Sequence, residues 1–504
     1  MNIHAWYKYQ HLFTDSDPSL VDQIAFGFPA AIDKSRLPSV PFTNHKSAIR
    51  DYQVVDEYIA THTASGVIVG PFPVNPLPVP IIVSPLQVAT SASGKKRVVC
   101  DMSYGNPSVN DLISGEWSTF PGYFGDFNLP NSDSLAAEIL ALGAGCKVFK
   151  ADMTAFYKQL RMDPADVPYT GFTWRQGIYL DLSMPFGMRS SALCAQRVSN
   201  GIAIIYYHES GGWTLVAYID DYAGPAPAAI ADRLYALFNK IADELGVDRA
   251  KVKCVPPVTL IEFLGLEYDT IELTVALPAD KLARVVTLIR DWLSMEQCSK
   301  SQLQKLVGVL NHCCYVVHPG KPFTARLLDV LRAKEFPVQL TDDFKLDLQA
   351  WLDFLTTEFS GKAMLKNLDF MDADATLRVA VDTQKCAFAT QCGPHTKFYM
   401  VSDPPPKCND QFLYACAIYQ ASTEYSSMLT CNPHLVSVPT KIIEAMVNRA
   451  KTDCAIARNL FRKAWIIQAR QDFVIKAKFS SEAKSSRLHK QLNKHKHCQK
   501  FYCM

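Results

Sequence analysis

Two adjacent carboxylates stand where an apolar segment ends. Asp220 and Asp221 come at the end of the run LVAYI, and the stretch 213–224 predicts a strand, a tight turn and a second strand. Taken alone, paired aspartates at a turn are common and are usually solvated. Asp152, earlier in the chain, ends a second short apolar run, VFKADM. Two strands of one sheet can bring Asp152 and Asp220 together, and close carboxylates raise each other's pKa unless a cation bridges them.

A carboxylate cluster of this kind suits phosphoryl transfer. Mg²⁺ prefers hard oxygen ligands, uses few protein carboxylates and leaves positions for substrate phosphates. Two such ions about 3.5–4 Å apart stabilise the attacking and leaving oxygens of an in-line displacement. The acids therefore predict polymerase or nuclease chemistry, with two Mg²⁺ ions, or Mn²⁺ in their place, as cofactors.

The elements that must position these acids form an α+β pattern. Alternating or short apolar runs predict strands at 96–102, 147–153, 177–184 and 259–269. Helical spacing predicts helices at 52–60, 133–142, 189–207 and 226–246. Strands and helices interleave in this part of the chain, which is typical of an α+β layer.

The pattern changes from residue 278 onward. Apolar residues recur at helical spacing over 282–293 and again over 303–310, so segment 278–360 predicts a small helical bundle. Strand patterns return at 374–400 and helical patterns at 442–470, and the last residues are rich in Lys and Arg.

Length and composition bound the remaining possibilities. The chain has 504 residues, 48% apolar and 20% charged, which excludes a disordered or fibrous chain and suggests roughly three domains. Lys and Arg total 51 against 49 Asp and Glu, so any basic groove for nucleic acid has to be local. Fifteen scattered cysteines indicate a reduced, intracellular protein. The polar start is unlike a signal peptide, and prolines break the apolar runs, so no membrane association is expected.

Four motifs in order carry a resemblance to a known family. FKADMTAFYKQL, MPFGMRSSALCAQ, YIDD and FLGLEYD resemble, in order and separation, the palm motifs of reverse transcriptases. A wider set looks like the tyrosine-recombinase retrotransposons of the DIRS and Ngaro type: NHKSA, GPF, SPL, RVVCDMSYGNPSVND, KSQLQKLVGVLN and HPGKPF. The likeness covers about residues 44–360 well and 374–490 loosely.

The resemblance implies a right-hand polymerase of fingers, palm and thumb, followed by a ribonuclease-H-like α/β domain. The expected division is an N-terminal extension at 1–43, fingers and palm at 44–275, a helical thumb or connection at 278–365, the ribonuclease-H-like domain at 372–475 and a basic tail at 476–504.

The resemblance also implies roles for the palm residues. Asp152, Asp220 and Asp221 would be the catalytic, metal-binding carboxylates, and the backbone carbonyl of Met153 would help to bind the metal. The ring of Tyr157 would stack under the incoming sugar and block a 2′-hydroxyl, which favours dNTPs over rNTPs. A core tyrosine at the start of a helix is the alternative for Tyr157.

Further residues would form the nucleotide and primer sites by the same resemblance. Arg97 would grip the triphosphate, with Lys95 and Lys96 as nearby candidates that are equally typical of a solvated turn. Either Lys251 or Lys253 would protonate pyrophosphate. The remaining implied contacts are Phe186 and Gly187 at the nascent base pair, Gln196 near the template, and Phe263, Leu264 and Gly265 in the primer hairpin. Ala155 and Met184 depart from the common pattern, and neither touches the metal chemistry.

The ribonuclease-H-like region matches its family only partly. Asp382 ends an apolar strand and matches the first aspartate of that metal site, and Glu424 matches the helix glutamate poorly. Thr440 and Lys441 stand where a third acid is required, and no aspartate occurs at 482–487. We therefore expect a degraded metal site and no ribonuclease H activity, although Asp382 alone is also typical of a turn.

Three functions remain open on the sequence. The first is an RNA-directed DNA polymerase of a retrotransposon, with an RNA template, a DNA primer, the RNA–DNA hybrid and dNTPs as partners. The second is a catalytically inactive, polymerase-derived nucleic-acid-binding or structural protein. The third, a metal-dependent nuclease, needs the carboxylates but leaves Tyr157, Phe186 and the primer hairpin unexplained.

Overall fold

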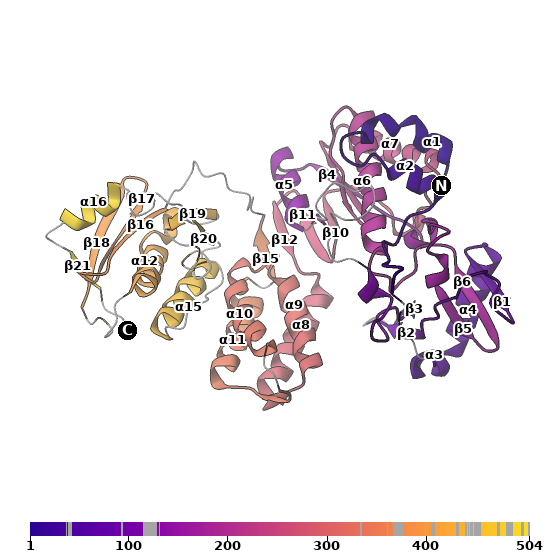
Figure 1. Cartoon of the computed structure of the whole chain (residues 1–504). Coiled ribbons are helices and arrows are strands. Elements are labelled where there is room, and N and C mark those ends of the chain that lie inside the picture. Colours follow the sequence, from indigo (N-terminus) through magenta and orange to yellow (C-terminus); the bar gives the residue numbers. More distant parts are fainter. Residues whose placement is uncertain are drawn as a thin grey trace. The chain divides into compact units, whose positions relative to one another are not determined.

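The computed structural model contains two compact units (Figure 1). Unit 1 comprises Met1–Asn131 and Cys146–Val258, and unit 2 comprises Ser132–Gly145 and Thr259–Met504. The structure describes residues 1–36, 38, 43–91, 94–113, 129–130, 132–332, 335–359, 361–365, 377–402, 404, 409–429, 433–438, 441, 443, 447, 455–470, 474–479, 487–494 and 498–501.

An antiparallel sheet and two helices form the centre of unit 1. The strands β7 (Val216–Tyr218), β8 (Asp221–Ala226), β4 (Lys147–Asp152) and β9 (Val255–Val258) lie in that order. The helices α6 (Ser191–Ser210) and α7 (Ala231–Glu244) contact this sheet. The Phe149 ring lies under Gly224, where a Cβ would come within 2.1 Å of the ring, and packs on Phe238 with 5.4 Å between centroids. Because side chains alternate along a strand, the opposite face carries Asp152 and Asp221.

The rest of unit 1 holds a smaller sheet and a hairpin. The strands β1 (Ile68–Phe72), β6 (Gly177–Asp181) and β5 (Gly171–Trp174) form an antiparallel sheet, and β2 (Leu86–Thr90) pairs with β3 (Lys96–Cys100). Further elements are α3 (Lys46–Arg50), α4 (Tyr52–Ala64), and the 3-10 helices η2 (Asn110–Leu112), η4 (Phe156–Gln159), η5 (Val167–Tyr169) and η6 (Lys251–Lys253). The strands expected at 96–102, 147–153 and 177–184 are confirmed.

The N-terminal residues belong to the core of unit 1. The segment folds as α1 (Ile3–Lys8), η1 (Gln10–Phe13) and α2 (Leu20–Phe26). Trp6, Phe13 and Leu20 are buried in the same cluster as the palm strands and α6. Gly201 on α6 admits this packing, since a Cβ there would lie 2.7 Å from Leu20 Cδ2. The prediction of a separate extension at 1–43 is therefore corrected, because apolar residues without a clear period pack here against a helix far along the chain.

A buried ion pair joins this segment to α6. Arg197 is 2% exposed, and its guanidinium donates to both carboxylate oxygens of Asp17 at 2.7 and 2.8 Å. The same side chain donates to Gln23 Oε1 at 2.6 Å and to Ser19 Oγ at 3.0 Å. A planar guanidinium with this set of acceptors is well satisfied in a low-dielectric site.

Unit 2 begins with a second antiparallel sheet, β10 (Leu260–Phe263), β11 (Leu266–Asp269), β12 (Thr274–Ala276) and β15 (Lys362–Met364). The helix α5 (Ser132–Leu142) is tied to this sheet, because Tyr268 Oη donates to the Ser132 carbonyl at 3.0 Å. The expected single strand at 259–269 is a hairpin that reverses at residues 264–265.

The expected helical module is confirmed. It contains α8 (Ala279–Ser294), α9 (Lys300–Cys313), η7 (His318–Gly320), α10 (Lys321–Leu331), α11 (Asp342–Asp353) and a short π-helix, η8 (Phe354–Glu358), with the short pair β13 (Gln297–Cys298) and β14 (Val338–Gln339). Ser299 and Gln302 form a capping box that fixes the start of α9.

The C-terminal domain has mixed strand directions. β16 (Leu377–Asp382), β17 (Ala387–Cys392) and β18 (His395–Val401) form an antiparallel meander, and β21 (Gln499–Phe501) pairs with β18 in parallel. β19 (Pro433–Val438) and β20 (Val474–Phe479) form a parallel pair. The helices are α12 (Asp410–Glu424), α13 (Ser426–Leu429), α15 (Ala455–Arg470) and α16 (Arg487–Lys494).

The basic segment at the C-terminus is part of this domain. Leu488 and Leu492 lie four residues apart on one face of α16 and pack on Ala380, Ala387 and Ala389 of the sheet. With β20 and β21 also in the domain, the prediction of a separate basic tail at 476–504 is corrected for the described residues. The high lysine content of this segment predicted a solvated tail, although Leu488 and Leu492 form a short apolar stripe at helical spacing.

Two expectations from composition concern the whole chain. Within the described ranges, no helix is both long and apolar enough to cross a bilayer. Ten of the described cysteines are not in a disulfide, whereas Cys386 is disulfide-bonded, so the expectation of a fully reduced chain fails at that residue.

We predict that Asp17→Asn destabilises unit 1. The substitution leaves the Arg197 charge buried without its carboxylate, which typically costs about 3–5 kcal/mol. Chemical denaturation of the purified protein measures this loss. Lys8→Met, which removes an exposed ion pair with Glu244 in the same segment, is the matched control and should change the unfolding free energy much less. Equal stability of Asp17→Asn and wild type would contradict a structural role for the pair.

Candidate active site

Strand register brings the three palm carboxylates to one end of the central sheet. Asp152 lies opposite Asp221 in the β4–β8 pair, and Tyr218 lies opposite Asp221 in the β7–β8 pair. Residues directly opposite on one face have Cβ atoms about 5 Å apart. Asp220 sits in the turn between β7 and β8, and its carbonyl accepts from Met153 N–H at 2.9 Å. The acids that the sequence singled out therefore converge.

Two side chains of α6 hold this turn. Ile219 has a φ of +52°, a conformation that is costly for a β-branched residue. Gln196 Oε1 accepts from Ile219 N–H at 2.8 Å, and its Nε2 donates to the Ala217 carbonyl at 2.8 Å. Ser199 Oγ donates to the Ile219 carbonyl. Gln196 is 1% exposed, so in this conformation it positions the turn that carries Asp220, whereas we expected it near the template.

Burial and mutual repulsion change the electrostatics of the acids. Burial raises the pKa of Asp220, and the charges of Asp221 and Asp152 raise it further. Burial also raises the pKa of Asp221, which Lys150 partly offsets. The ammonium of Lys150 lies 3.5 Å from Asp221 Oδ1, too far for a good hydrogen bond, and this oxygen is buried without a hydrogen-bond partner.

A second lysine pairs with the first aspartate. Lys253 Nζ donates to both carboxylate oxygens of Asp152 at 2.8 Å each, while the Lys253 side chain remains 55% exposed. The chain places it there because Ala250 N–H donates to the Asp152 carbonyl at 2.7 Å, just before η6. Of the two lysines that the sequence left open, Lys253 is thus at the acids, and Lys251 is exposed and makes no such contact.

The rings of Tyr157 and Phe186 meet beside the acids. Their centroids lie 4.7 Å apart with planes tilted by 57°. Tyr157 is half-buried, and burial together with the nearby Asp220 charge raises its pKa to about 12. Gly187 has a φ of +108°, and a Cβ there would lie 2.0 Å from the Cys100 carbonyl oxygen, so only glycine fits. Asn110 supports this loop by donating to the Gly187 carbonyl at 2.8 Å.

The predicted triphosphate-binding residues lie at the start of β3 and directly before it, in the same unit. Lys95, Lys96 and Arg97 are all exposed. Lys96 pairs with Asp51 at 2.6 Å, whereas Arg97 makes no hydrogen bond or ion pair to any described residue. Arg97 shares its strand face with Val99, whose side chain lies against Gly187. Arg97 is therefore an exposed cation with no partner among the described residues, on the side of the strand that faces the glycine loop.

The predicted primer hairpin is a tight turn in unit 2. Phe263 ends β10, and Leu264 and Gly265 both have positive φ, at +48° and +78°, as a type I′ hairpin turn requires. A ring nitrogen of His312 lies 3.0 Å from the Leu264 carbonyl, and Lys281 Nζ donates to the Gly265 carbonyl at 3.1 Å. The hairpin exists as expected and is anchored on the helical module.

The two ribonuclease-H-like acids are not brought together. Asp382 ends β16 and accepts from Gln384 and Lys385 N–H at 3.0 and 3.1 Å, the geometry of a turn. Glu424 is the last residue of α12, and its carboxylate pairs with the Lys397 ammonium at 3.0 Å. In the strand register, Lys397 of β18 lies level with Val379 of β16. Val379 is three residues, or about 10 Å, along β16 from Asp382. The prediction that Glu424 shares a site with Asp382 is corrected. Of the residues expected further along, Thr440 lies outside the described part, and Lys441 is exposed.

Several residues of the site were missed on the sequence. Lys150 is two positions before Asp152, and strand alternation alone puts both on one face. Ser199 is three positions after Gln196 on α6, the spacing of helical neighbours. Asn110 has no signal of its own, because its contact with Gly187 depends on loop geometry.

Two curated relatives resemble part of this chain, and no known family model matches it. They are the enzymatic polyproteins of the Strasbourg and CM-1841 strains of cauliflower mosaic virus, each 26% identical over 248 residues. The match covers 49% of this chain and 32% of each relative, so the chain spans about a third of the length of the curated relatives it matches.

Solved structures of similar fold include the foamy viral protease-reverse transcriptase. Its complex with an RNA/DNA hybrid has a TM-score of 0.52 at 12% identity and covers 95% of this chain and 63% of that chain. Its complex with dsDNA has a TM-score of 0.50 at 14% identity and covers 95% and 97%. The predicted fold class is confirmed: this chain has the α+β fold of a reverse transcriptase polymerase followed by a ribonuclease-H-like domain.

Proposed function

We propose that this protein is an RNA-directed DNA polymerase that transfers dNTPs to a primer 3′-hydroxyl by a two-metal mechanism. One observation carries the proposal: Asp152 lies opposite Asp221 across two strands, with Asp220 fixed in the adjoining turn. The named complexes of the structural relatives, an RNA/DNA hybrid and dsDNA, support an RNA template and a DNA primer as partners.

The chemistry of the donor set fits divalent cations. Asp221 Oδ1 is a buried acceptor without a hydrogen bond, and burial, followed by the charges of neighbouring acids, raises the pKa values of Asp220 and Asp221. Asp152, Asp220, Asp221 and the carbonyl of Met153 would hold the ions. Within the described residues no cluster of three His, Cys, Asp or Glu side chains closes around a metal by itself. That agrees with Mg²⁺ sites that substrate phosphates and water complete. When bound, the ions would stabilise charge on the attacking and leaving oxygens.

The chain's own residues supply the remaining requirements. Arg97, an exposed guanidinium with no partner among the described residues, suits the triphosphate oxygens of the incoming nucleotide. The Lys253 ammonium lies beside Asp152 with its side chain 55% exposed, so it would be the proton donor to a leaving pyrophosphate. Tyr157 and Phe186 present the ring surface against which the sugar and base of a dNTP would lie.

We further infer that the polymerase comes from a DIRS- or Ngaro-type retrotransposon. The motif RVVCDMSYGNPSVND, upstream of the palm acids, and the motif HPGKPF of the helical module support this assignment. The first of them contains Asn110, which supports the Gly187 loop, so this motif contributes directly to the site.

An inactive nucleic-acid-binding protein is the alternative. It is favoured by the two ammonium groups that already lie beside the acids, Lys253 on Asp152 and Lys150 near Asp221. Nucleotide incorporation separates the two functions, because binding alone would produce none.

Replacement of the turn acids should abolish DNA synthesis. We expect Asp220→Asn with Asp221→Asn to lower primer extension on an RNA template by roughly 10²–10³-fold or more, since charge stabilisation at the reacting phosphate is lost. Asp232→Asn, on the exposed start of α7, is the control and should extend primers as wild type does. Synthesis that persists in the double variant would refute the assignment of these acids.

Stability without metal should depend on pH through the same acids. The pKa values of Asp220 and Asp221 in the folded protein are raised above 3.8. At a pH above these raised pKa values both acids are charged, which lowers the free energy of unfolding. This loss of stability disappears as the pH falls toward 3.8. At neutral pH without divalent ions, the double asparagine variant should therefore have a higher melting temperature than wild type. The difference between the two melting temperatures should decrease as the pH is lowered. Mg²⁺ should raise the melting temperature of wild type alone. An equal Mg²⁺ response in both proteins would place the ion elsewhere.

The ribonuclease-H-like domain should not cut RNA. We expect the RNA strand of a labelled RNA–DNA hybrid to stay intact with Mg²⁺ or Mn²⁺ under conditions where DNA synthesis proceeds, because Asp382 and Glu424 lie apart. Cleavage that Asp382→Asn abolishes would contradict this expectation.

A further inference from the structure

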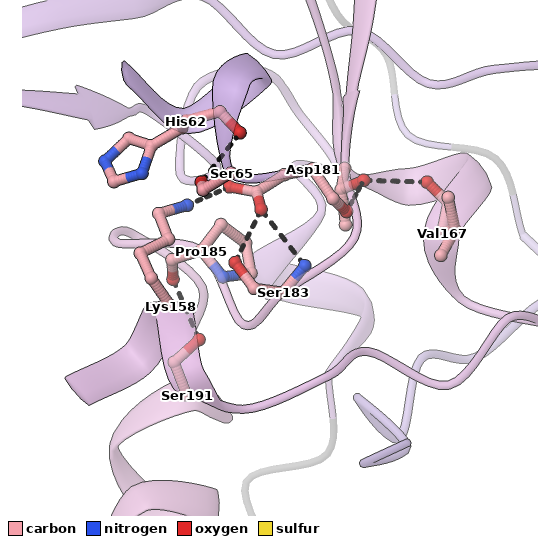
Figure 2. Close-up of polar contacts among 9 residues, drawn as sticks. His62, Ser65, Lys158, Val167, Asp181, Ser183, Pro185 and Ser191 are labelled. Atoms are coloured by element: carbon pink, nitrogen blue, oxygen red, sulfur yellow. Dashed lines mark hydrogen bonds and ion pairs between the residues drawn. The ribbon is translucent and has the colours of Figure 1, made fainter. Parts of the chain in front are cut away.

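A buried ion pair lies next to the proposed nucleotide pocket and is unused by the mechanism above. Lys158 Nζ donates to Asp181 Oδ2, and both side chains are 5% exposed. Figure 2 shows the lysine reaching from its own segment to the aspartate, which also faces Ser183. Two charges this deeply buried need a reason, since apolar residues of similar volume are often as stabilising.

The pair connects the two segments that carry the pocket rings. Lys158 directly follows Tyr157 within η4. Asp181 ends β6, at the start of the loop that leads to Phe186. In that loop Ser183 donates to Asp181 Oδ1 through its N–H at 3.1 Å and its hydroxyl at 2.7 Å. The carboxylate thus holds the lysine with one oxygen and the loop with the other.

Backbone bonds extend the connection on both sides. Met162 N–H donates to the Leu182 carbonyl and Met184 N–H to the Leu160 carbonyl, each at 2.9 Å. Ser191 Oγ, at the start of α6, donates to the Pro185 carbonyl at 2.8 Å (Figure 2). These hydrogen bonds therefore join the segment after Tyr157 to the loop before Phe186.

Residues of the helix α4 also pack around the ion pair. The Lys158 ammonium lies 5.6 Å from the centroid of the Tyr58 ring, and the His62 ring packs on that ring at 4.6 Å. Strand β1 continues from α4, with Ile68 opposite Asp181. The ion pair is consequently enclosed by groups that fix its geometry, and its ammonium cannot turn toward solvent without unpacking α4.

We propose that Lys158 and Asp181 are positioning residues that set the separation of Tyr157 and Phe186, and thereby the discrimination between deoxyribonucleotides and ribonucleotides. The inference rests on the proposed polymerase function. The two rings are 4.7 Å apart, so a small shift of either segment changes the space available to a 2′-hydroxyl. Directional bonds to a charged pair restrict such a shift more than apolar packing does.

The experiment compares dNTP and rNTP incorporation by the full chain on a primed RNA template. Lys158→Met should lower the ratio of kcat/KM for dNTP over rNTP by about tenfold, since a misplacement of about 1 Å can cost on the order of 10²-fold in rate. Lys158→Arg keeps the charge and should restore most of the ratio. The double variant Lys158→Met with Asp181→Leu removes both buried charges, so it should fold even if the single variants do not, and its ratio should also fall.

Asp347→Asn is the matched control. Asp347 is an equally buried carboxylate, 2% exposed and paired with Arg326 and Arg462 in unit 2, so its loss tests destabilisation without touching the pocket. It should leave the dNTP/rNTP ratio unchanged.

Each outcome decides one question. A folded double variant with the wild-type ratio overturns the positioning role while the polymerase function stands. A ratio that falls equally in Asp347→Asn shows that general destabilisation is the cause and also overturns it. Wild-type protein that incorporates no nucleotide refutes the proposed function, and the inference with it.

Discussion

Like charges held close together at the end of a sheet are the constraint on which this structure depends. Antiparallel register makes Asp152 and Asp221 direct neighbours, and the turn adds Asp220. Burial and repulsion raise the pKa values of both turn acids, so the bare cluster is unfavourable by itself. Lys150 and Lys253 reduce this cost from two sides. A cluster that the fold maintains against its own repulsion is typical of a site built for cations and phosphates.

The rest of unit 1 keeps the cluster in place. Gln196 and Ser199 use one face of α6 to hold a strained turn, and Arg197 ties the same helix to the N-terminal segment. The support of the acids therefore reaches from the first residues of the chain through α6 to the turn at Asp220. The neighbouring loop depends on a position where only glycine fits, Gly187 against the Cys100 carbonyl.

The sequence predicted those features that depend on local patterns. Alternation and apolar runs located the palm strands, and the YIDD turn followed from two acids at the end of a strand. Contacts between distant segments could not be predicted from the sequence. Nothing in the first 43 residues indicates the Asp17–Arg197 pair. No pattern around Gln196 shows whether its amide binds the turn or contacts the template. Charge counts misled at the C-terminus, where two leucines of α16 outweigh its lysines. Motif matching assigned Glu424 to the metal site only because it is a glutamate on a helix. In the structure its position is set by the ion pair with Lys397.

The most direct measurement is anomalous diffraction from Mn²⁺ in crystals of the protein with a primer, an RNA template and a non-hydrolysable dNTP. The account predicts anomalous peaks about 2–2.5 Å from carboxylate oxygens of Asp152 and of the Asp220–Asp221 turn, with Lys253 displaced from Asp152. Peaks remote from these oxygens, with the Lys253–Asp152 pair intact, would contradict it.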